Sequence, residues 1–131
     1  MKVLGFYSEL WPSSSEWDGG IRDFVTDAPQ PNEQDVAAYL RGGHTLFASM
    51  GVVDDVLGSG EGIVGGSSLF TDGEWVWRGD LWFYATTYHL RLPEEFTSKI
   101  HAAGYAVPPV AQERLMELTD EVLVLRSRGR K

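Results

Sequence analysis

The 131-residue sequence predicts an α+β fold, a single domain in which an antiparallel sheet packs with three to four helices. The strongest observation is the Asp72-Gly73 pair between the β-prone runs 63–70 and 74–78, because such a pair is the best short-range hairpin signal. A second observation is the helical spacing of apolar residues, with start and stop signals, over 33–41, 81–88, 93–103 and 110–125. The domain is expected to span residues 1–131, with 126–131 as a frayed tail.

The N-terminal third predicts one strand, loops and a helix. Residues 3–7 are β-prone, whereas 8–20 are rich in serine and glycine and predict a loop. Residues 21–25 fit either a short helix or a short strand. The clearest helix is expected over 33–41, because Asn32 is a favourable N-cap, acidic residues follow it, and two glycines end the segment.

The middle of the chain predicts most of the sheet. Three further segments precede the hairpin: a strand at 44–50, a short strand or turn at 51–57, and a flexible connection at 58–62. Within the first arm of the hairpin, Gly65-Gly66 indicates a bulge or a close approach of the backbone. In the second arm, strand alternation places Trp75 and Trp77 on one face and Val76 on the other.

Helices dominate the prediction after the hairpin. Asp80 is a suitable cap for the aromatic helix that follows it. Pro93 at the first position of the next helix has no hydrogen bond to lose, and Gly104 ends that helix. The last helix is predicted from apolar spacing, and a break at Thr119-Asp120 stays open.

Charge is the most informative global property. The formal net charge is −8, and residues 1–80 alone hold 13 acidic and 4 basic side chains. A field of this sign repels phosphate backbones, so the sequence predicts no nucleic-acid partner. It attracts basic partners and speeds their encounter, although the same charge also serves solubility.

Composition excludes several classes of protein. The chain has no cysteine, which excludes disulfides, thiolate-bound zinc, iron–sulfur clusters and a cysteine nucleophile. No apolar run approaches the roughly 20 residues of a membrane helix. The N-terminus turns polar too early for a signal peptide. We therefore expect a cytoplasmic protein without membrane contact.

Motifs for catalysis or metal binding are sparse. The three histidines form no metal-binding pattern, and Asp54-Asp55 with Glu61 matches no EF-hand loop. The glycine-rich run 58–66 lacks the lysine that would hold a phosphate, and no serine has a nucleophile-elbow context. His89 fits either a general base or a hydrogen-bonded core histidine. We expect no cofactor, no metal and no catalytic residues, and an enzyme stays the less favoured class.

The aromatic side chains support two interpretations. Trp75 and Trp77 beside carboxylates have the composition of a recognition surface, because tryptophans dominate interface hot spots. Alternatively, the hairpin packs these indoles into the core. Trp11 and Trp17 lie in the serine-rich loop, where they fit an exposed site or a lid over the sheet.

A resemblance points in the same direction as the charge. The hairpin Thr71-Asp72-Gly73-Glu74-Trp75-Val76-Trp77, followed by an aromatic helix and the step Leu92-Pro93-Glu94-Glu95-Phe96, resembles a group of short uncharacterised bacterial proteins. The resemblance covers about residues 60–105. Small acidic proteins of this kind are similar to the immunity proteins of bacterial toxin systems, which bind and block a cognate toxin. The resemblance implies a fold and a partner class, and it assigns no functional residue.

The function expected from these observations is that of a non-enzymatic binding protein, an immunity-type inhibitor that occludes a basic toxin or other basic protein. The expected partner-binding residues are Asp54, Asp55, Glu61, Asp72, Glu74, Trp75 and Trp77. The alternative is a small enzyme or ligand-binding domain with a pocket between the 63–78 hairpin and the 81–90 aromatic helix, lined by Asp72, Trp75, Tyr84 and His89. A third possibility is a self-associating structural subunit, so the oligomeric state stays open.

Overall fold

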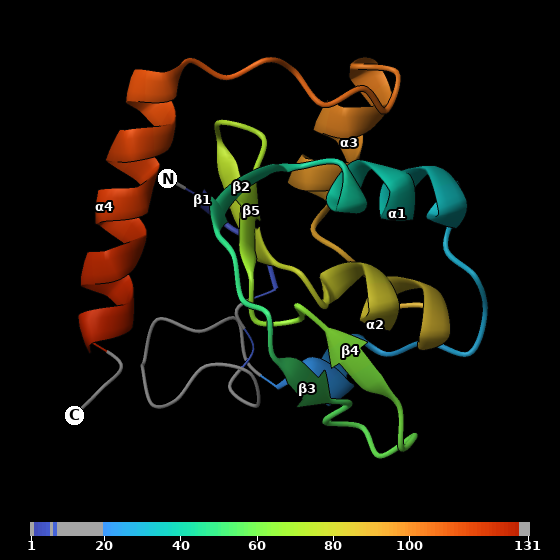
Figure 1. Cartoon of the computed structure of the whole chain (residues 1–131). Helices are drawn as coiled ribbons and strands as arrows, with labels where there is room; N and C mark the ends of the chain where they lie inside the picture. The colour runs from blue at the N-terminus through green and yellow to red at the C-terminus, as the bar shows by residue number, and fades with distance from the viewer. Residues whose placement is uncertain (1, 6, 8–19, 129–131) are drawn as a thin grey trace.

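The computed structural model describes residues 2–5, 7 and 20–128 and confirms the α+β prediction (Figure 1). The main sheet has the strand order β1-β6-β5-β2. Its strands are β1 (Lys2–Val3), β2 (His44–Phe47), β5 (Leu69–Thr71) and β6 (Trp75–Arg78). β2, β5 and β6 pair antiparallel, whereas β1 pairs parallel with β6, so the sheet is mixed.

Helices cover both faces of this sheet. The described helices are η1 (Ile21–Phe24, a 3₁₀ helix), α1 (Glu33–Arg41), α2 (Leu81–Thr87), α3 (Glu94–Ala102) and α4 (Gln112–Arg128). In Figure 1, α4 lies on one side of the sheet, and α1, α2 and α3 lie on the other. None of the described helices combines the length and apolar character that a membrane span needs.

Strand alternation in β6 divides the core into two clusters, as the sequence predicts. Trp75 and Trp77 face the larger cluster, where the Phe96 ring of α3 makes edge contacts with both indoles at 5.5 and 6.0 Å between ring centroids. Val76 faces the opposite way and packs with Leu118 and Val122 of α4. Because both faces of β6 are covered, β6 is the most deeply buried strand of the sheet.

The predicted first arm of the hairpin, 63–70, is two strands instead of one. Its first part forms β4 (Gly62–Val64), which pairs antiparallel with β3 (Val52–Asp54) in a separate two-stranded sheet. Gly65 has φ of 68° and turns the chain away from β4. At Gly66 a Cβ would lie 2.4 Å from Val53 Cγ2, so the glycine pair marks a turn with close backbone approach. Only β5 and β6 form the hairpin around Asp72-Gly73.

The helix starts differ from the predicted caps. Asn32 has φ of 56° and makes no side-chain cap, and instead Gln30 N–H donates to the Glu33 carboxylate at 2.9 Å. Asp80 makes no cap to α2 because its carboxylate pairs with Arg78. α4 continues without a break through the Thr119-Asp120 pair.

The remaining element boundaries follow the prediction with small shifts. β2 ends at Phe47, earlier than the expected strand 44–50, and α4 extends to Arg128, into the segment expected to fray. The expected loop 8–20 lies outside the described residues apart from Gly20, and so do Trp11 and Trp17.

Candidate functional site

The turn between β5 and β6 is built around the buried carboxylate of Asp72. Its Oδ1 accepts the backbone N–H groups of Glu74 at 3.0 Å and Trp75 at 2.8 Å, and its Oδ2 accepts from Tyr39 Oη at 2.6 Å and Lys99 Nζ at 2.9 Å. Burial by itself would raise the pKa of Asp72, but these hydrogen bonds outweigh it and hold the pKa below its ordinary value. Asp72 therefore holds the turn against α1 and α3, and only 3% of the residue is exposed to solvent.

The two tryptophans of β6 are sealed in the core. Trp75 is 5% exposed and Trp77 is fully buried, with Trp77 Nε1 donating to Leu40 O at 2.9 Å. Contact between these indoles and a partner would require opening the larger core cluster, so the structure gives no support to the predicted anchor role. Glu74 is exposed, but Lys2 and Lys99 lie 3.8 and 3.7 Å from its carboxylate and offset its charge.

Asp55 is also buried, at the junction of the two-stranded sheet with α2. Its carboxylate accepts the N–H groups of Leu57 at 2.8 Å and Ser59 at 3.2 Å and the hydroxyl of Tyr88. Burial would raise the pKa of Asp55, but the hydrogen bonds from Ser59, Tyr88 and the backbone outweigh it and lower the pKa. Tyr84 Oη accepts Val56 N–H at 3.0 Å beside it. Asp55 therefore holds the β3–β4 connection against α2.

The outer face of the two-stranded sheet β3–β4 is exposed to solvent, and it carries the predicted partner-binding residue Asp54. Val52 and Val64 are register partners and are 62% and 78% exposed. Met50, just before β3, is 91% exposed. Asp54 shares the outer face with Val52 because alternate residues of a strand point the same way. We call Met50, Val52, Asp54 and Val64 the ribbon face; Glu61 is exposed immediately before β4.

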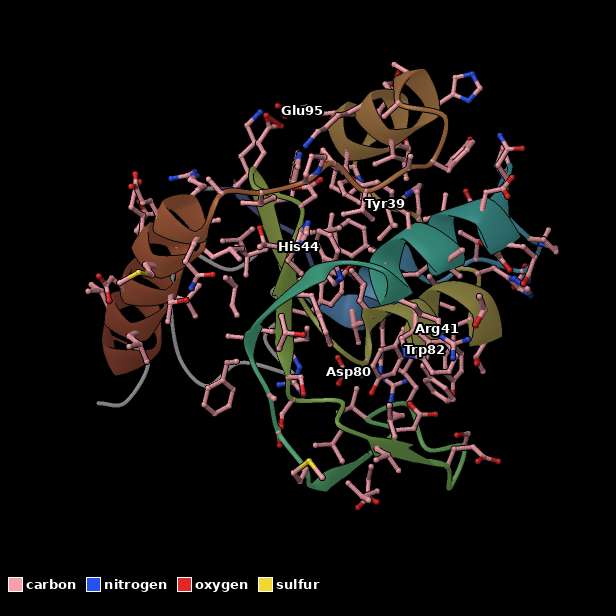
Figure 2. The ribbon with its side chains drawn as sticks, turned by 45° about the horizontal axis from the view of Figure 1, so that its top comes forward. Tyr39, Arg41, His44, Asp80, Trp82 and Glu95 are labelled. Carbon is pink, nitrogen blue, oxygen red and sulfur yellow. The ribbon has the colours of Figure 1, made fainter. Side chains whose placement is uncertain are left out.

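A hollow borders the ribbon face. It has a volume of about 200 Å³, and its walls include Val64, Arg41 and Trp82. The Arg41 guanidinium carbon lies 4.6 Å from the centroid of the Trp82 ring, a cation–π contact whose two members are labelled in Figure 2. Sequence reasoning missed Arg41, Trp82 and the two valines. The alternation of Val52 and Asp54 beside a glycine-rich turn was the signal that could have found the valines.

The four residues of the predicted alternative pocket do not come together. Asp72 and Trp75 lie at the β5–β6 turn against α3, whereas Tyr84 Oη binds Val56 N–H near β3. Burial is the main cause that raises the pKa of Tyr84, to about 12. His89 Nδ1 lies 3.0 Å from both carboxylate oxygens of Glu33, at the start of α1.

Other chemistry within the described residues is limited. Those residues include no group of three or more His, Cys, Asp or Glu side chains placed to hold a metal ion. Asp80 is fully buried and receives Arg78 Nε at 3.2 Å and Arg78 Nη2 at 2.9 Å. The three buried carboxylates, those of Asp55, Asp72 and Asp80, are thus held by partners of their own, which is the pattern of structural groups.

Comparison of this chain with protein-family models, with curated proteins and with solved structures finds no match. The fold and its surface define an acidic α+β protein with an exposed apolar ribbon.

Proposed function

We propose that this chain is a non-enzymatic binding protein, in concrete terms an immunity-type inhibitor that occludes a basic protein partner through the ribbon face. The observation that carries the proposal is the exposed Val52–Val64 pair. It lies on a two-stranded sheet with no further strand partner in the described structure, and Asp54 lies on the same face.

Energetics favour a covered state of this face. Apolar surface gains about 25 cal/mol for each Å² that is removed from water, so the exposed parts of Met50, Val52 and Val64 gain free energy when a partner buries them. An apolar centre with polar groups around it is the usual anatomy of a recognition surface. The ribbon face has that arrangement on a small scale, with Asp54 and Glu61 beside the valines.

Charge selects the class of partner. Residues 1–80 contain 13 acidic and 4 basic side chains, and Asp54 and Glu61 remain exposed among them. Carboxylates at the border of an interface speed encounter with a basic protein and pair with its lysines and arginines. Of the expected partner-binding residues, we retain Asp54 and Glu61 for this role, and the valines replace the tryptophans as apolar anchors.

The hollow beside Val64 strengthens the proposal. Arginine and tryptophan are among the residue types that carry the most binding free energy at interfaces. Arg41 and Trp82 line this hollow together with Val64, so a partner on the ribbon face also reaches their stacked pair.

The proposal is tested by affinity capture at low salt from the cells that express the chain, followed by binding measurements with the purified captured protein. We expect the double variant Val52→Thr/Val64→Thr to bind at least about tenfold more weakly than the wild type, because a hydroxyl buried in an interface without a hydrogen-bond partner costs about 1–3 kcal/mol and about 1.4 kcal/mol is a factor of ten. Salt at about 0.5 M should weaken the wild-type complex, since it screens exposed charges.

The matched control is Leu123→Ser on α4, where the side chain is 53% exposed but distant from the ribbon in sequence and element. It should bind like the wild type. Equal binding by the ribbon variant and the wild type would contradict the proposal, as would an acidic partner. Light scattering tests self-association: a dimer that the ribbon variant abolishes would assign the face to a second copy of the chain.

A further inference from the structure

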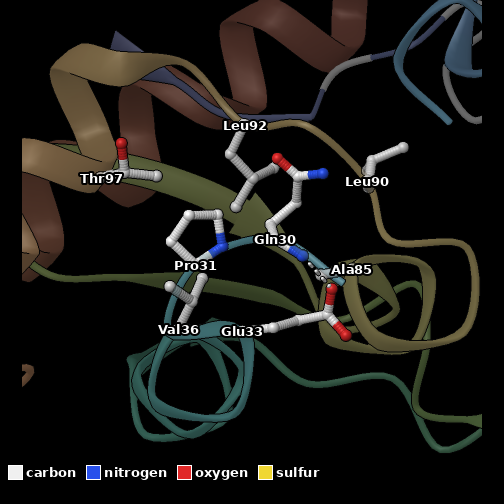
Figure 3. Close-up of a pocket in the computed structure, with 8 residues that line it drawn as sticks. All are labelled: Gln30, Pro31, Glu33, Val36, Ala85, Leu90, Leu92 and Thr97. Carbon is white, nitrogen blue, oxygen red and sulfur yellow. Dashed lines mark hydrogen bonds between the residues drawn. The ribbon is translucent and has the colours of Figure 1, made fainter. Parts of the chain in front are cut away.

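A second hollow lies away from the ribbon face, where the start of α1, the end of α2 and the start of α3 approach one another (Figure 3). Its volume is about 150 Å³. The residues that line it are Gln30, Pro31, Glu33, Val36, Ala85, Leu90, Leu92 and Thr97. Most of its wall is therefore aliphatic, and a cavity of about this size is known to hold a molecule as large as benzene.

The polar groups of this hollow act as hydrogen-bond acceptors. The Glu33 side chain is only 9% exposed, and its carboxylate already accepts Gln30 N–H and faces His89 Nδ1 at 3.0 Å. The side-chain nitrogen of Gln30 donates to Thr26 Oγ1 at 2.9 Å, so the amide oxygen is the end that can accept from a ligand. Thr97 Oγ1 donates to Glu94 O at 3.2 Å and keeps its lone pairs as acceptors.

Non-glycine residues with positive φ lie near this hollow. A neighbouring hollow of about 280 Å³ shares Pro31, Val36 and Thr97 with the first, and the two together form one groove between α1 and α3. Asn32, with φ of 56°, and Tyr105, with φ of 60°, line the second hollow. His89, with φ of 52°, faces Glu33 at the first.

These three are the described non-glycine residues with positive φ; Asn32 and Tyr105 line the groove, and His89 contacts Glu33, which lines it. Left-handed backbone is unfavourable for residues with a side chain, and it persists mainly where function or dense packing requires it.

We propose that this groove binds a small organic amine in its ammonium form, with the apolar part of the ligand against Val36, Ala85 and Leu92 and the ammonium at Glu33. Ammonium supplies N–H donors and positive charge, which match an acceptor-lined hollow with a largely buried carboxylate. A carboxylate ligand would meet Glu33 as a like charge, within a chain of net charge −8. This inference is independent of the proposed docking function.

The test uses three probes of one shape on the whole chain: benzylamine, benzyl alcohol and benzoate. Binding is followed by backbone amide NMR at about pH 8, where an aliphatic amine such as benzylamine still carries its positive charge. We expect benzylamine to bind at least about tenfold more tightly than benzyl alcohol, as a charge-assisted hydrogen bond predicts, and benzoate not to bind. The shifted amides should lie in 30–36, 85–92 and around Thr97.

Two variants separate the carboxylate from general charge. Glu33→Gln should bring the affinity for benzylamine to that of benzyl alcohol, whereas Asp35→Asn, which removes an exposed carboxylate from the same first turn of α1, should leave it within about twofold. Equal affinity for the amine and the alcohol in the wild type overturns the proposal, and so do amide shifts confined to other surfaces. The wild-type probe series decides the question even where Glu33→Gln fails to fold.

Discussion

The β5–β6 turn and the β3–β4 ribbon carry similar residues and use them in opposite ways. Both place aspartates beside large apolar side chains, and both belong to the surface expected from the sequence to bind a partner. In the turn, Asp72, Trp75 and Trp77 are buried and serve the core. In the ribbon, Val52, Asp54 and Val64 point into solvent.

The difference follows from the number of layers around each strand. β6 is an inner strand of the main sheet and has α1 and α3 on one face and α4 on the other, so both sets of alternate side chains are covered. In the ribbon, Ile63 is buried on one face, whereas Val52 and Val64 on the other face are largely exposed. Residue type alone therefore does not indicate an interaction surface; coverage by neighbouring elements does.

The largest expected effect is the loss of a core indole. Trp77→Ala should lower the free energy of unfolding by about 3–5 kcal/mol, the usual cost of removing a large buried aromatic side chain. It also leaves the carbonyl of Leu40 without its indole donor. Urea denaturation measures the effect. A loss below about 1 kcal/mol would show that the indole is not packed as described.

A smaller effect is expected at the buried carboxylate of the turn. Asp72→Asn keeps the shape of the side chain but removes the charge that Lys99 and Tyr39 face, and it should cost about 2–3 kcal/mol of unfolding free energy. The matched change in the ribbon, Asp54→Asn, should stay within about 0.5 kcal/mol because that carboxylate is exposed. Equal costs in denaturant titrations would contradict the contrast between the two regions.

The dependence of the unfolding free energy on acid pH also distinguishes the buried Asp72 from an exposed carboxylate such as Asp54. The lowered pKa of Asp72 means that its contribution is present above the ordinary aspartate pKa of about 3.9 and is lost as pH falls through the lower folded value. In Asp72→Asn the loss of stability below about pH 4 should therefore be smaller than in the wild type. Urea midpoints between about pH 2.5 and pH 6 measure this difference.

The pKa shift of Asp80 is opposite in direction to that of Asp72, so its effect on stability at acid pH is also opposite. Burial raises the pKa of Asp80 even though Arg78 is beside it, so the folded state takes up this proton first and gains stability as pH falls. Asp80→Asn should make the acid loss steeper than in the wild type. If this variant instead lost less stability at acid pH than the wild type, the raised pKa assigned to Asp80 would be contradicted.

The smallest effect on folding is expected at the ribbon face. Val52→Thr/Val64→Thr should change the free energy of unfolding by no more than about 0.5 kcal/mol, because both side chains are exposed in the folded chain. The same variant should lose partner binding, so stability and binding separate at this site. Paired denaturation and binding measurements on one preparation check both parts, and a large loss of stability would show that these valines are core residues.

Local signals were enough to predict several elements. The Asp72-Gly73 hairpin and the bounds of α1 at Glu33–Arg41 agree with the turn and stop residues, which act over a few positions, although Asn32 does not cap α1 with its side chain. The division of 63–70 between two sheets could not be predicted in this way. It depends on the turn at Gly65 and on the pairing of β4 with β3, which is a contact between distant segments.

The candidate sites also differ in whether local sequence features could predict them. Asp54 and Glu61 were predicted from the excess of carboxylates in the first eighty residues, and both side chains are exposed in the structure. The groove beside Glu33 joins residues from three helices and two connections, and no spacing in the sequence brings them together.

The sequence by itself determined the fold class, most helix positions, the hairpin and the strongly acidic character of the chain, since propensity, periodicity and charge are properties of neighbouring residues. Only the tertiary structure decided that the tryptophans of β6 are buried, that Val52 and Val64 are exposed, and that Glu33 lies beside an aliphatic hollow. Burial depends on which elements pack against each face, and that is set by contacts between segments far apart along the chain.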